Sequence, residues 1–276
     1  MRVTVNQIKE MKQKGEKIAM LTTYDYSTAR IVDGASIPLI LVGDSLGTVV
    51  LGYGSTIPVT MEEMLHHTKA VVRGTEKAMI IGDMPFMTYH VSMEDALRNA
   101  GRFLQEAGAQ AVKLEGGVTV ADKVRRIVDC GIPVMGHIGL TPQSINQLGG
   151  HKIQGKTPEA AARMLKDAQA LEEAGAFAVV LETVPTPLAT LITQQVSIPT
   201  IGIGAGSGCD GQVQVINDLL GSFSDFVPKH AKQYAKLIDI MSNAVSEYLG
   251  EVKSGKFPTA ANSFPMDESV LAGLKK

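Results

Sequence analysis

"IPLILVGDS", at residues 37–45, carries an apolar run directly into Gly-Asp-Ser. A short apolar run bounded by turn residues is typical of a strand that is buried on both faces, as in a parallel sheet. A turn after such a strand needs only Gly or Asn, so turn formation alone does not explain why the carboxylate of Asp44 stands there. The remaining motifs decide whether Asp44 is a turn residue or a ligand.

The same pattern recurs along the chain. Each copy has an amphipathic segment, then Gly with small residues, then an apolar run that ends in a Gly or an acid. We predict eight strands of this kind, at residues 17–25, 37–45, 77–86, 109–117, 131–139, 176–184, 197–206 and 224–230.

Helical patterns separate the predicted strands. Thr60 and Glu63 have the spacing of a capping box. Thr157 precedes Pro158, a residue that is favoured at the first helical position. The expected helices span residues 61–74, 92–108, 119–130, 157–175, 186–196, 211–220 and 229–250.

The regular alternation of buried strands and helices predicts an α/β fold, a single-domain (β/α)8 TIM barrel. A doubly wound open sheet is the main structural alternative, but eight units without a break in composition favour closure. We expect an extra helix in the first sixteen residues, closing the bottom of the barrel. The barrel domain is expected over residues 1–254, with a C-terminal tail over 255–276.

The composition argues against several classes of function. A net charge of −2 gives no electrostatic footprint for nucleic acid or an anionic membrane, and the absence of Trp disfavours base stacking. Cys130 and Cys209 make neither a disulfide framework nor a zinc site. No apolar run has the length of a membrane span or a signal peptide. We expect a cytoplasmic protein that acts on small molecules.

Ionisable residues lie at the carboxyl ends of most predicted strands. These ends converge on one face of a barrel, where the active sites of this fold lie. Five acids with one Lys and one His would repel one another unless a cation or a substrate compensated their charge. The residues at this rim are Asp25, Asp44, Asp83, Lys113, Glu115, His137 and Glu182.

Alternatives stay open at this rim. A single acid at a strand end can be a turn former or a helix cap. Lys113 and Glu115 are two residues apart and share one side of their strand, so they fit either a site in the barrel mouth or a structural ion pair. His137 fits either a substrate contact or a structural hydrogen bond.

The candidate metal ligands are oxygen donors, which favours a hard cation, Mg²⁺ before Zn²⁺. Mg²⁺ commonly takes one or two protein carboxylates besides water and substrate oxygens, and Asp44 and Asp83 suit that pattern. Such an ion could chelate a 2-oxo acid and ease removal of the adjacent proton. Glu182, on a strand across the mouth, is a candidate base.

Two further motifs are less informative. "GIGAGSGCDGQV" (202–213) is a glycine-rich turn that we expect to lead into a helix, and it fits either a tight turn or an anion site. His66 and His67 fall inside a predicted helix without partner spacing, which favours a packing or solvated role.

Taken together, these motifs resemble the ketopantoate hydroxymethyltransferase family, over about residues 2–265. The N-terminal signature is the stretch from "TTYDYS" to "STIPVT" (22–60). It is followed, in the family's order, by "GDMPF" (82–86), "VKLEGG" (112–117), "PVMGHIGLTPQ" (133–143), "LETVP" (181–185) and "IGIGAGSGCDGQV" (201–213).

The resemblance implies roles for individual residues. Asp44 and Asp83 would bind Mg²⁺ and, with Ser45, the oxo acid. Lys113 would bind the substrate carboxylate, and Glu115 would lie at the metal. Glu182 would be the general base. The family's fold is a (β/α)8 barrel.

The resemblance also implies the reaction and the assembly. The one-carbon unit of 5,10-methylenetetrahydrofolate would be added to 3-methyl-2-oxobutanoate, giving 2-dehydropantoate for pantothenate biosynthesis. Glu182 would remove the C3 proton, and Mg²⁺ with Lys113 would hold the enolate that attacks the methylene carbon. The family forms large homo-oligomers, typically decamers in bacteria.

Two rival functions compete with this one. A Mg²⁺-dependent barrel lyase acting on 2-oxo acids would use the same rim, and folate dependence separates it from the transferase. A catalytically inactive, metabolite-binding barrel would lack at least one of the residues Asp44, Asp83, Lys113 and Glu182, and all of them are present. We place the folate between the loops 46–59 and 137–153, the first of which covers the site or contacts a neighbouring subunit.

Overall fold

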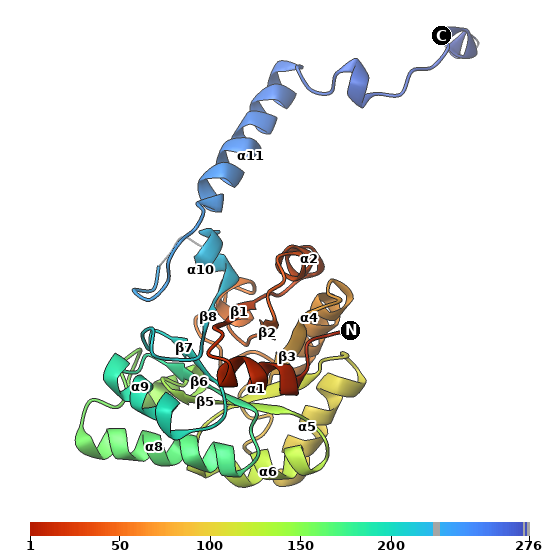
Figure 1. Ribbon diagram of the computed structural model, residues 1–276. Coiled ribbons are helices and arrows are strands. Elements are labelled where there is room, and N and C mark those ends of the chain that lie inside the picture. Colours follow the sequence, from red (N-terminus) through yellow and green to blue (C-terminus); the bar gives the residue numbers. More distant parts are fainter. Residues whose placement is uncertain (223–226, 273, 275–276) are drawn as a thin grey trace.

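Eight parallel strands pair in chain order and close into a barrel, because β8 also pairs with β1 (Figure 1). The computed structural model describes residues 1–222, 227–272 and 274. The predicted TIM-barrel fold is therefore confirmed. The strands are Ile18–Thr22 (β1), Leu39–Val42 (β2), Met79–Asp83 (β3), Ala111–Glu115 (β4), Val134–Gly139 (β5), Ala178–Glu182 (β6), Thr200–Ile203 (β7) and Gly211–Gln214 (β8).

Helices surround the barrel, and several begin where the sequence predicts. Thr60 accepts a hydrogen bond from the Glu63 N–H, and the Glu63 carboxylate accepts one from the Thr60 N–H, so the capping box is present. The α-helices are Val5–Gln13 (α1), Tyr26–Gly34 (α2), Leu46–Val49 (α3), Met61–Arg73 (α4), Met93–Gln105 (α5), Ala121–Asp129 (α6), Ile145–Leu148 (α7), Pro158–Glu173 (α8), Thr186–Gln195 (α9), Ile216–Leu220 (α10) and Leu237–Ser254 (α11). Short 3₁₀ turns lie at Val118–Val120 (η1), Pro142–Ser144 (η2), Ala260–Asn262 (η3) and Glu268–Leu271 (η4).

Strand alternation divides the buried apolar side chains into two clusters. One lies inside the barrel and includes Leu39 and Leu41, whereas the other lies between strands and helices. On β4, Val112 and Leu114 belong to the outer cluster. Lys113, whose position alternates with theirs, therefore faces the barrel interior, as the sequence pattern predicts.

The extra N-terminal helix is also confirmed. Ile8 of α1 is fully buried and packs in the inner cluster with Ile18, the first residue of β1. Lys12 donates hydrogen bonds to the carbonyls of Thr193, Val196 and Ile198 and forms an ion pair with Asp210 (2.9 Å). α1 thus closes the end of the barrel where the strands begin.

The prediction for the eighth strand was wrong. β8 is Gly211–Gln214, inside the segment expected to be helical, and the helix that follows it, α10, is only five residues long. Residues 224–226 of the predicted strand lie outside the described part of the chain, and residues 227–230 form no strand. β8 has no apolar run, because its alternate residues Gln212 and Gln214 lie on the outer face, so it lacks the pattern of a doubly buried strand.

The glycine-rich turn lies between two strands. Residues 204–210 connect β7 to β8 rather than leading into a helix, so no helix N-terminus lies behind them. At the start of β8, a Cβ on Gly211 would lie 2.3 Å from the carbonyl oxygen of Ile18. The glycine at this position is required for close approach of β8 to β1.

α11 extends away from the barrel (Figure 1) and has no buried residue. It begins later than predicted, at Leu237, and the segment that we predicted as a tail follows its end at Ser254. Its exposed apolar side chains are Ile238, Ile240, Met241, Val245, Tyr248, Leu249 and Val252. Within the described residues, no helix is long and apolar enough to cross a membrane.

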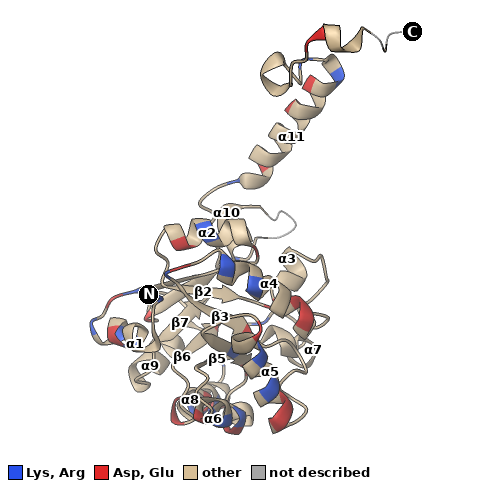
Figure 2. Ribbon diagram, turned by 90° about the vertical axis from the view of Figure 1, so that its right-hand side faces the viewer, with Lys and Arg blue, Asp and Glu red and all other residues tan. Residues whose placement is uncertain are grey.

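Charged residues are mixed over the molecule. Figure 2 shows Lys and Arg interspersed with Asp and Glu over the helices around the barrel. Some form exposed pairs, such as Arg102 with Glu106 and Glu62. Pairs of this kind contribute little to stability.

Candidate active site

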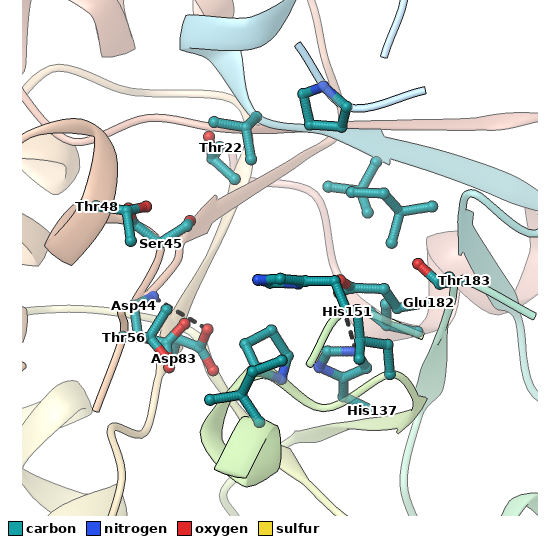
Figure 3. Close-up of a pocket in the computed structure, with 18 of the residues that line it drawn as sticks. Thr22, Asp44, Ser45, Thr48, Thr56, Asp83, His137, His151, Glu182 and Thr183 are labelled. Atoms are coloured by element: carbon teal, nitrogen blue, oxygen red, sulfur yellow. Dashed lines mark hydrogen bonds and ion pairs between the residues drawn. The ribbon is translucent and has the colours of Figure 1, made fainter. Parts of the chain in front are cut away.

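A cavity of about 670 Å³ opens at the carboxyl ends of the strands (Figure 3). Every strand contributes to its wall, either directly or through the residues that follow it. The lining includes Thr22, Asp44, Asp83, Lys113, Glu115, His137, Glu182, Ile203 and Val213. The predicted convergence of ionisable side chains is therefore present, except for Asp25.

Asp25 has the local role of a helix cap. Its carboxylate accepts hydrogen bonds from the Thr28 N–H (2.9 Å) and the Thr28 hydroxyl (2.7 Å) at the start of α2, and the residue is exposed. Asp25 is therefore a helix cap, which is one of the alternatives for a single acid at a strand end.

Asp83 and Lys113 form a buried ion pair at the floor of the cavity. Lys113 Nζ lies 2.7 Å from Asp83 Oδ1 and 2.8 Å from Oδ2, and both side chains are almost inaccessible. The two residues are register partners on β3 and β4, which fixes their approach. The sheet therefore holds the two charged groups at a fixed short distance. Removing either partner would leave an uncompensated buried charge.

Asp44 lies beside this pair. Its backbone N–H donates to Asp83 Oδ2 (3.2 Å), and its Oδ2 accepts a hydrogen bond from Gln143 Nε2 (2.9 Å). Ser45 follows, and its hydroxyl is 2.8 Å from the Tyr24 hydroxyl. The Gly-Asp-Ser turn thus places Asp44 and Ser45 in the cavity wall, next to Asp83.

His137 lies between two carboxylates. Its Nδ1 is 3.4 Å from Glu115 Oε1, and its Nε2 is 3.3 Å from Glu182 Oε2. The side chain of Glu182 is 17% exposed, whereas those of Glu115 and His137 are each 3% exposed. Glu182 is therefore the member of this group that a molecule in the cavity reaches most easily. Figure 3 shows Glu182 next to His137 at the cavity.

The cluster has more negative than positive charge. Burial raises the pKa of Asp44 well above its ordinary value, and the charges of Asp83 and Glu115 raise that pKa further. Burial also raises the pKa of Asp83, although Lys113 opposes the shift. Burial lowers the pKa of Lys113, but the nearby carboxylates outweigh it and keep the ammonium charged. Around Asp44, the two neighbouring carboxylates thus outnumber the one ammonium of Lys113.

Gln143 and Tyr89 complete the cluster and were not among the predicted site residues. The Gln143 N–H donates to Glu115 Oε2 (3.1 Å), and the Tyr89 hydroxyl donates to Gln143 Oε1 (2.6 Å). The Tyr89 hydroxyl also accepts from the Glu115 N–H (3.1 Å). Gln143 is the last residue of the motif "PVMGHIGLTPQ", and this motif was the sequence feature that could have identified it as a site residue. Its contacts, however, depend on a loop that folds back over the barrel.

The segment 46–59 forms part of the wall. It begins with the short helix α3, and Thr48, Val49 and Thr56 line the cavity. Behind it, His67 Nδ1 lies 2.6 Å from the Tyr24 carbonyl oxygen, so this histidine has the packing role expected of it.

The donor set suits a hard divalent cation. Within residues 1–222, 227–272 and 274, no group of three or more His, Cys, Asp or Glu side chains could hold a metal ion. Mg²⁺ needs no such group, because one or two carboxylates can suffice when the substrate supplies oxygens. The carboxylates of Asp44, Asp83 and Glu115 lie close enough for the charges of Asp83 and Glu115 to act on Asp44, and a divalent cation would offset that repulsion. The residues present therefore fit Mg²⁺.

The closed barrel and the charged cavity at its mouth define a (β/α)8-barrel enzyme. Comparison with solved structures agrees on the fold. Phosphonopyruvate hydrolase superposes with a TM-score of 0.62 at 13% identity, covering 98% of this chain and 94% of that one. At this identity the likeness concerns the fold alone.

Sequence comparison is more specific. The family model described as ketopantoate hydroxymethyltransferase matches residues 2–260. A 3-methyl-2-oxobutanoate hydroxymethyltransferase of Dehalococcoides mccartyi (strain ATCC BAA-2266 / KCTC 15142 / 195) is 71% identical over 276 residues, covering 100% of this chain and 98% of the relative. One from Chloroflexus aurantiacus (strain ATCC 29366 / DSM 635 / J-10-fl) is 59% identical over 272 residues, with 99% and 96% covered. The chain belongs to the ketopantoate hydroxymethyltransferase family, and it is a hydroxymethyltransferase.

Proposed function

We propose that the protein transfers the one-carbon unit of 5,10-methylenetetrahydrofolate to 3-methyl-2-oxobutanoate, giving 2-dehydropantoate for pantothenate biosynthesis, with Mg²⁺ as cofactor. The names of its relatives support the acceptor. The observation that carries the proposal is the buried, net negative cluster of Asp44, Asp83, Glu115 and Lys113, with Glu182 facing the same cavity. A 2-oxo acid bound there would have its carbonyl at a cation and its C3 within reach of a base.

The residues that would hold Mg²⁺ are Asp44 and Asp83, with Glu115 beside them. When bound, the ion supplies Lewis acidity that makes the C3 proton of the oxo acid easier to remove. Lys113 uses part of its donor capacity on Asp83. Because an ammonium has three donors, it can also bind the anionic substrate, together with the Ser45 hydroxyl.

Glu182 would act as the general base. It would take the C3 proton, and the electron pair left at C3 would form the new bond to the methylene carbon of the folate. Both bonds from that carbon to N5 and N10 of the folate would break, and water would supply the hydroxyl oxygen. The C3 proton and one proton of the water balance the N–H groups of the tetrahydrofolate that leaves. The contact of 3.3 Å from Glu182 Oε2 to His137 Nε2 orients the base toward the cavity.

The test is exchange of deuterium into C3 of 3-methyl-2-oxobutanoate, followed by NMR with and without Mg²⁺. We expect exchange that requires Mg²⁺ and falls by roughly 10²- to 10⁴-fold in Glu182→Gln, because general base catalysis contributes that much. Glu173→Gln, an exposed position at the end of α8, is the matched control and should exchange like the wild type.

A second assay separates the rival functions. Addition of 5,10-methylenetetrahydrofolate should yield 2-dehydropantoate. Absence of exchange and of this product would sink the proposal. Products of carbon–carbon bond cleavage without folate would instead favour a Mg²⁺-dependent lyase acting on 2-oxo acids.

We propose further that the enzyme works in the cytoplasm as a homo-oligomer, a decamer as the family resemblance implies. The exposed apolar side chains of α11 support self-association, because surfaces of this kind mark interaction sites.

A further inference from the structure

Asp218, on α10, is a buried carboxylate that the proposed reaction leaves without a role. It is 8% exposed and lines the same cavity as Asp44 and Glu182. Burial raises the pKa of Asp218, and His230, which lines the same cavity, opposes that shift through its charge. Among the residues that the structure describes, none donates a hydrogen bond to the Asp218 carboxylate. Buried carboxylates normally accept hydrogen bonds, so one at a cavity wall without a donor among the described residues indicates a donor that comes from the ligand.

α10 is fixed over the β1 side of the cavity. The Ile216 N–H donates to the hydroxyl of Thr22, the last residue of β1 (3.0 Å), and Thr22 itself lines the cavity, as Figure 3 shows. Leu219 and Leu220 pack against the outer core cluster. Asp218 therefore lies on a short helix that is anchored on both sides rather than on a loose segment.

Asp218 is also close to the reacting cluster. Burial raises the pKa of the Tyr24 phenol, and the charges of Asp218 and Asp44 both raise it further. The charges of both carboxylates thus act on one buried tyrosine. The hydroxyl of this tyrosine is 2.8 Å from the hydroxyl of Ser45.

The chemistry of the two substrates decides which of them could pair with Asp218. The 2-oxo acid offers only acceptors, its carboxylate and its keto oxygen, so it cannot satisfy a carboxylate. The pterin ring of a folate carries a 2-amino group and an adjacent N3–H, and a carboxylate binds such a pair of parallel donors in a bidentate manner.

The cavity has room for a second molecule. Its volume of about 670 Å³ is far larger than a five-carbon acid needs. The apolar side chains of Ile203, Val213 and Val215, on β7, β8 and just before α10, line the same cavity as Asp218 and suit a flat ring.

We propose that Asp218 binds the pterin ring of the folate co-substrate by accepting hydrogen bonds from its 2-amino group and N3–H. The assignment rests on the proposed function and extends it to the recognition of the donor. It places the ring against β8 and α10, and the rest of the folate then runs between the loops 46–59 and 137–153, both of which line the cavity.

The experiment measures two quantities on the full-length protein. Calorimetric titration with tetrahydrofolate gives the dissociation constant, and C3 deuterium exchange without folate reports the oxo-acid site separately. We expect Asp218→Asn to bind tetrahydrofolate roughly 10- to 100-fold more weakly, the loss expected for hydrogen bonds to a charged group, with exchange unchanged. Asp129→Asn, at the exposed end of α6, is the control and should change neither.

A folate analogue tests the contact itself. Tetrahydrofolate that lacks the 2-amino group should bind the wild type more weakly than tetrahydrofolate does, and Asp218→Asn should weaken its binding much less than that of tetrahydrofolate. Such coupling distinguishes a direct contact from a structural role. The analogue also tests the contact in wild-type protein if an Asp218 variant fails to fold.

Several outcomes would overturn the assignment. Equal binding of tetrahydrofolate by Asp218→Asn and the wild type would overturn it alone. Loss of C3 exchange in Asp218→Asn would indicate a structural residue and would overturn it as well. A wild type that exchanges C3 but binds no tetrahydrofolate would overturn both the assignment and the folate donor, while leaving the role of Glu182 intact.

Discussion

His137 owes its charge to the two carboxylates that flank it. Burial and the charge of Lys113 lower its pKa, but Glu115 and Glu182 outweigh them and raise the pKa to about 9. The ring is therefore an imidazolium at neutral pH. A charged ring between Glu115 and Glu182 lowers the pKa of Glu115 despite its burial and holds the proposed base in place.

We expect the His137 ring to titrate near pH 9 in metal-free protein, followed by NMR of the imidazole C–H signals. Because the folded pKa lies above the unfolded value of about 6.5, the contribution of His137 to stability is complete below about pH 6.5. That contribution is lost as the pH rises through about 9. Glu182→Gln should lower the midpoint, and a wild-type midpoint below 7 would contradict this account.

The turn η2, which follows β5, connects the elements that form the cluster. From this turn, Gln143 donates to Asp44 after β2, to the Met84 carbonyl oxygen after β3 (3.0 Å) and to Glu115 on β4. A single side chain and its backbone N–H thus set the separation of two proposed metal ligands. Residues that orient ligands in this way commonly affect metal affinity without touching the metal.

We expect Gln143→Leu to weaken Mg²⁺ binding by roughly 10- to 100-fold, because the Asp44 carboxylate loses its side-chain donor. The dependence of C3 exchange on Mg²⁺ concentration, together with direct titration of Mg²⁺, measures this effect. Gln105→Leu, at the exposed end of α5, is the matched control. An unchanged Mg²⁺ dependence in Gln143→Leu would show that η2 does not organise the ligands.

Element prediction succeeded where the local pattern is strong. The capping box at Thr60 and the Pro at position 158 mark real helix starts, and the apolar runs of β2, β3 and β6 are buried strands. It failed at β8, whose outer face is polar and whose pairing with β1 depends on closure of the whole barrel. No local pattern carries that information.

At the scale of the whole molecule, α11 is the part that the barrel does not stabilise. None of its residues is buried, although apolar side chains such as Ile240, Met241 and Val245 lie along it. Burying one such side chain contributes about 1.5–3 kcal/mol, so packing several of them against a second copy would drive association.

We therefore expect the double variant Ile240→Glu and Val245→Glu to lower the molecular mass found by light scattering, because each carboxylate would have to be buried without a partner. Its circular dichroism should match the wild type, since the barrel makes no use of these side chains. Asn243→Glu, an exposed polar position on the same helix, serves as control. A wild type that is monomeric at micromolar concentration would refute self-association through α11.

The sequence by itself determined the barrel, its N-terminal helix and the positions of Asp44, Asp83, Lys113, Glu115, His137 and Glu182 at strand ends. Strand and helix periodicity are local, and parallel strands in a closed barrel must bring their carboxyl ends to one face. Only the tertiary structure decided that Asp25 caps a helix, that Gln143 joins Asp44 to Glu115, and that Asp218 lies at the cavity wall. Such contacts depend on how the loops fold across the mouth of the barrel. The spacing of residues along the chain does not determine which loop residues meet there.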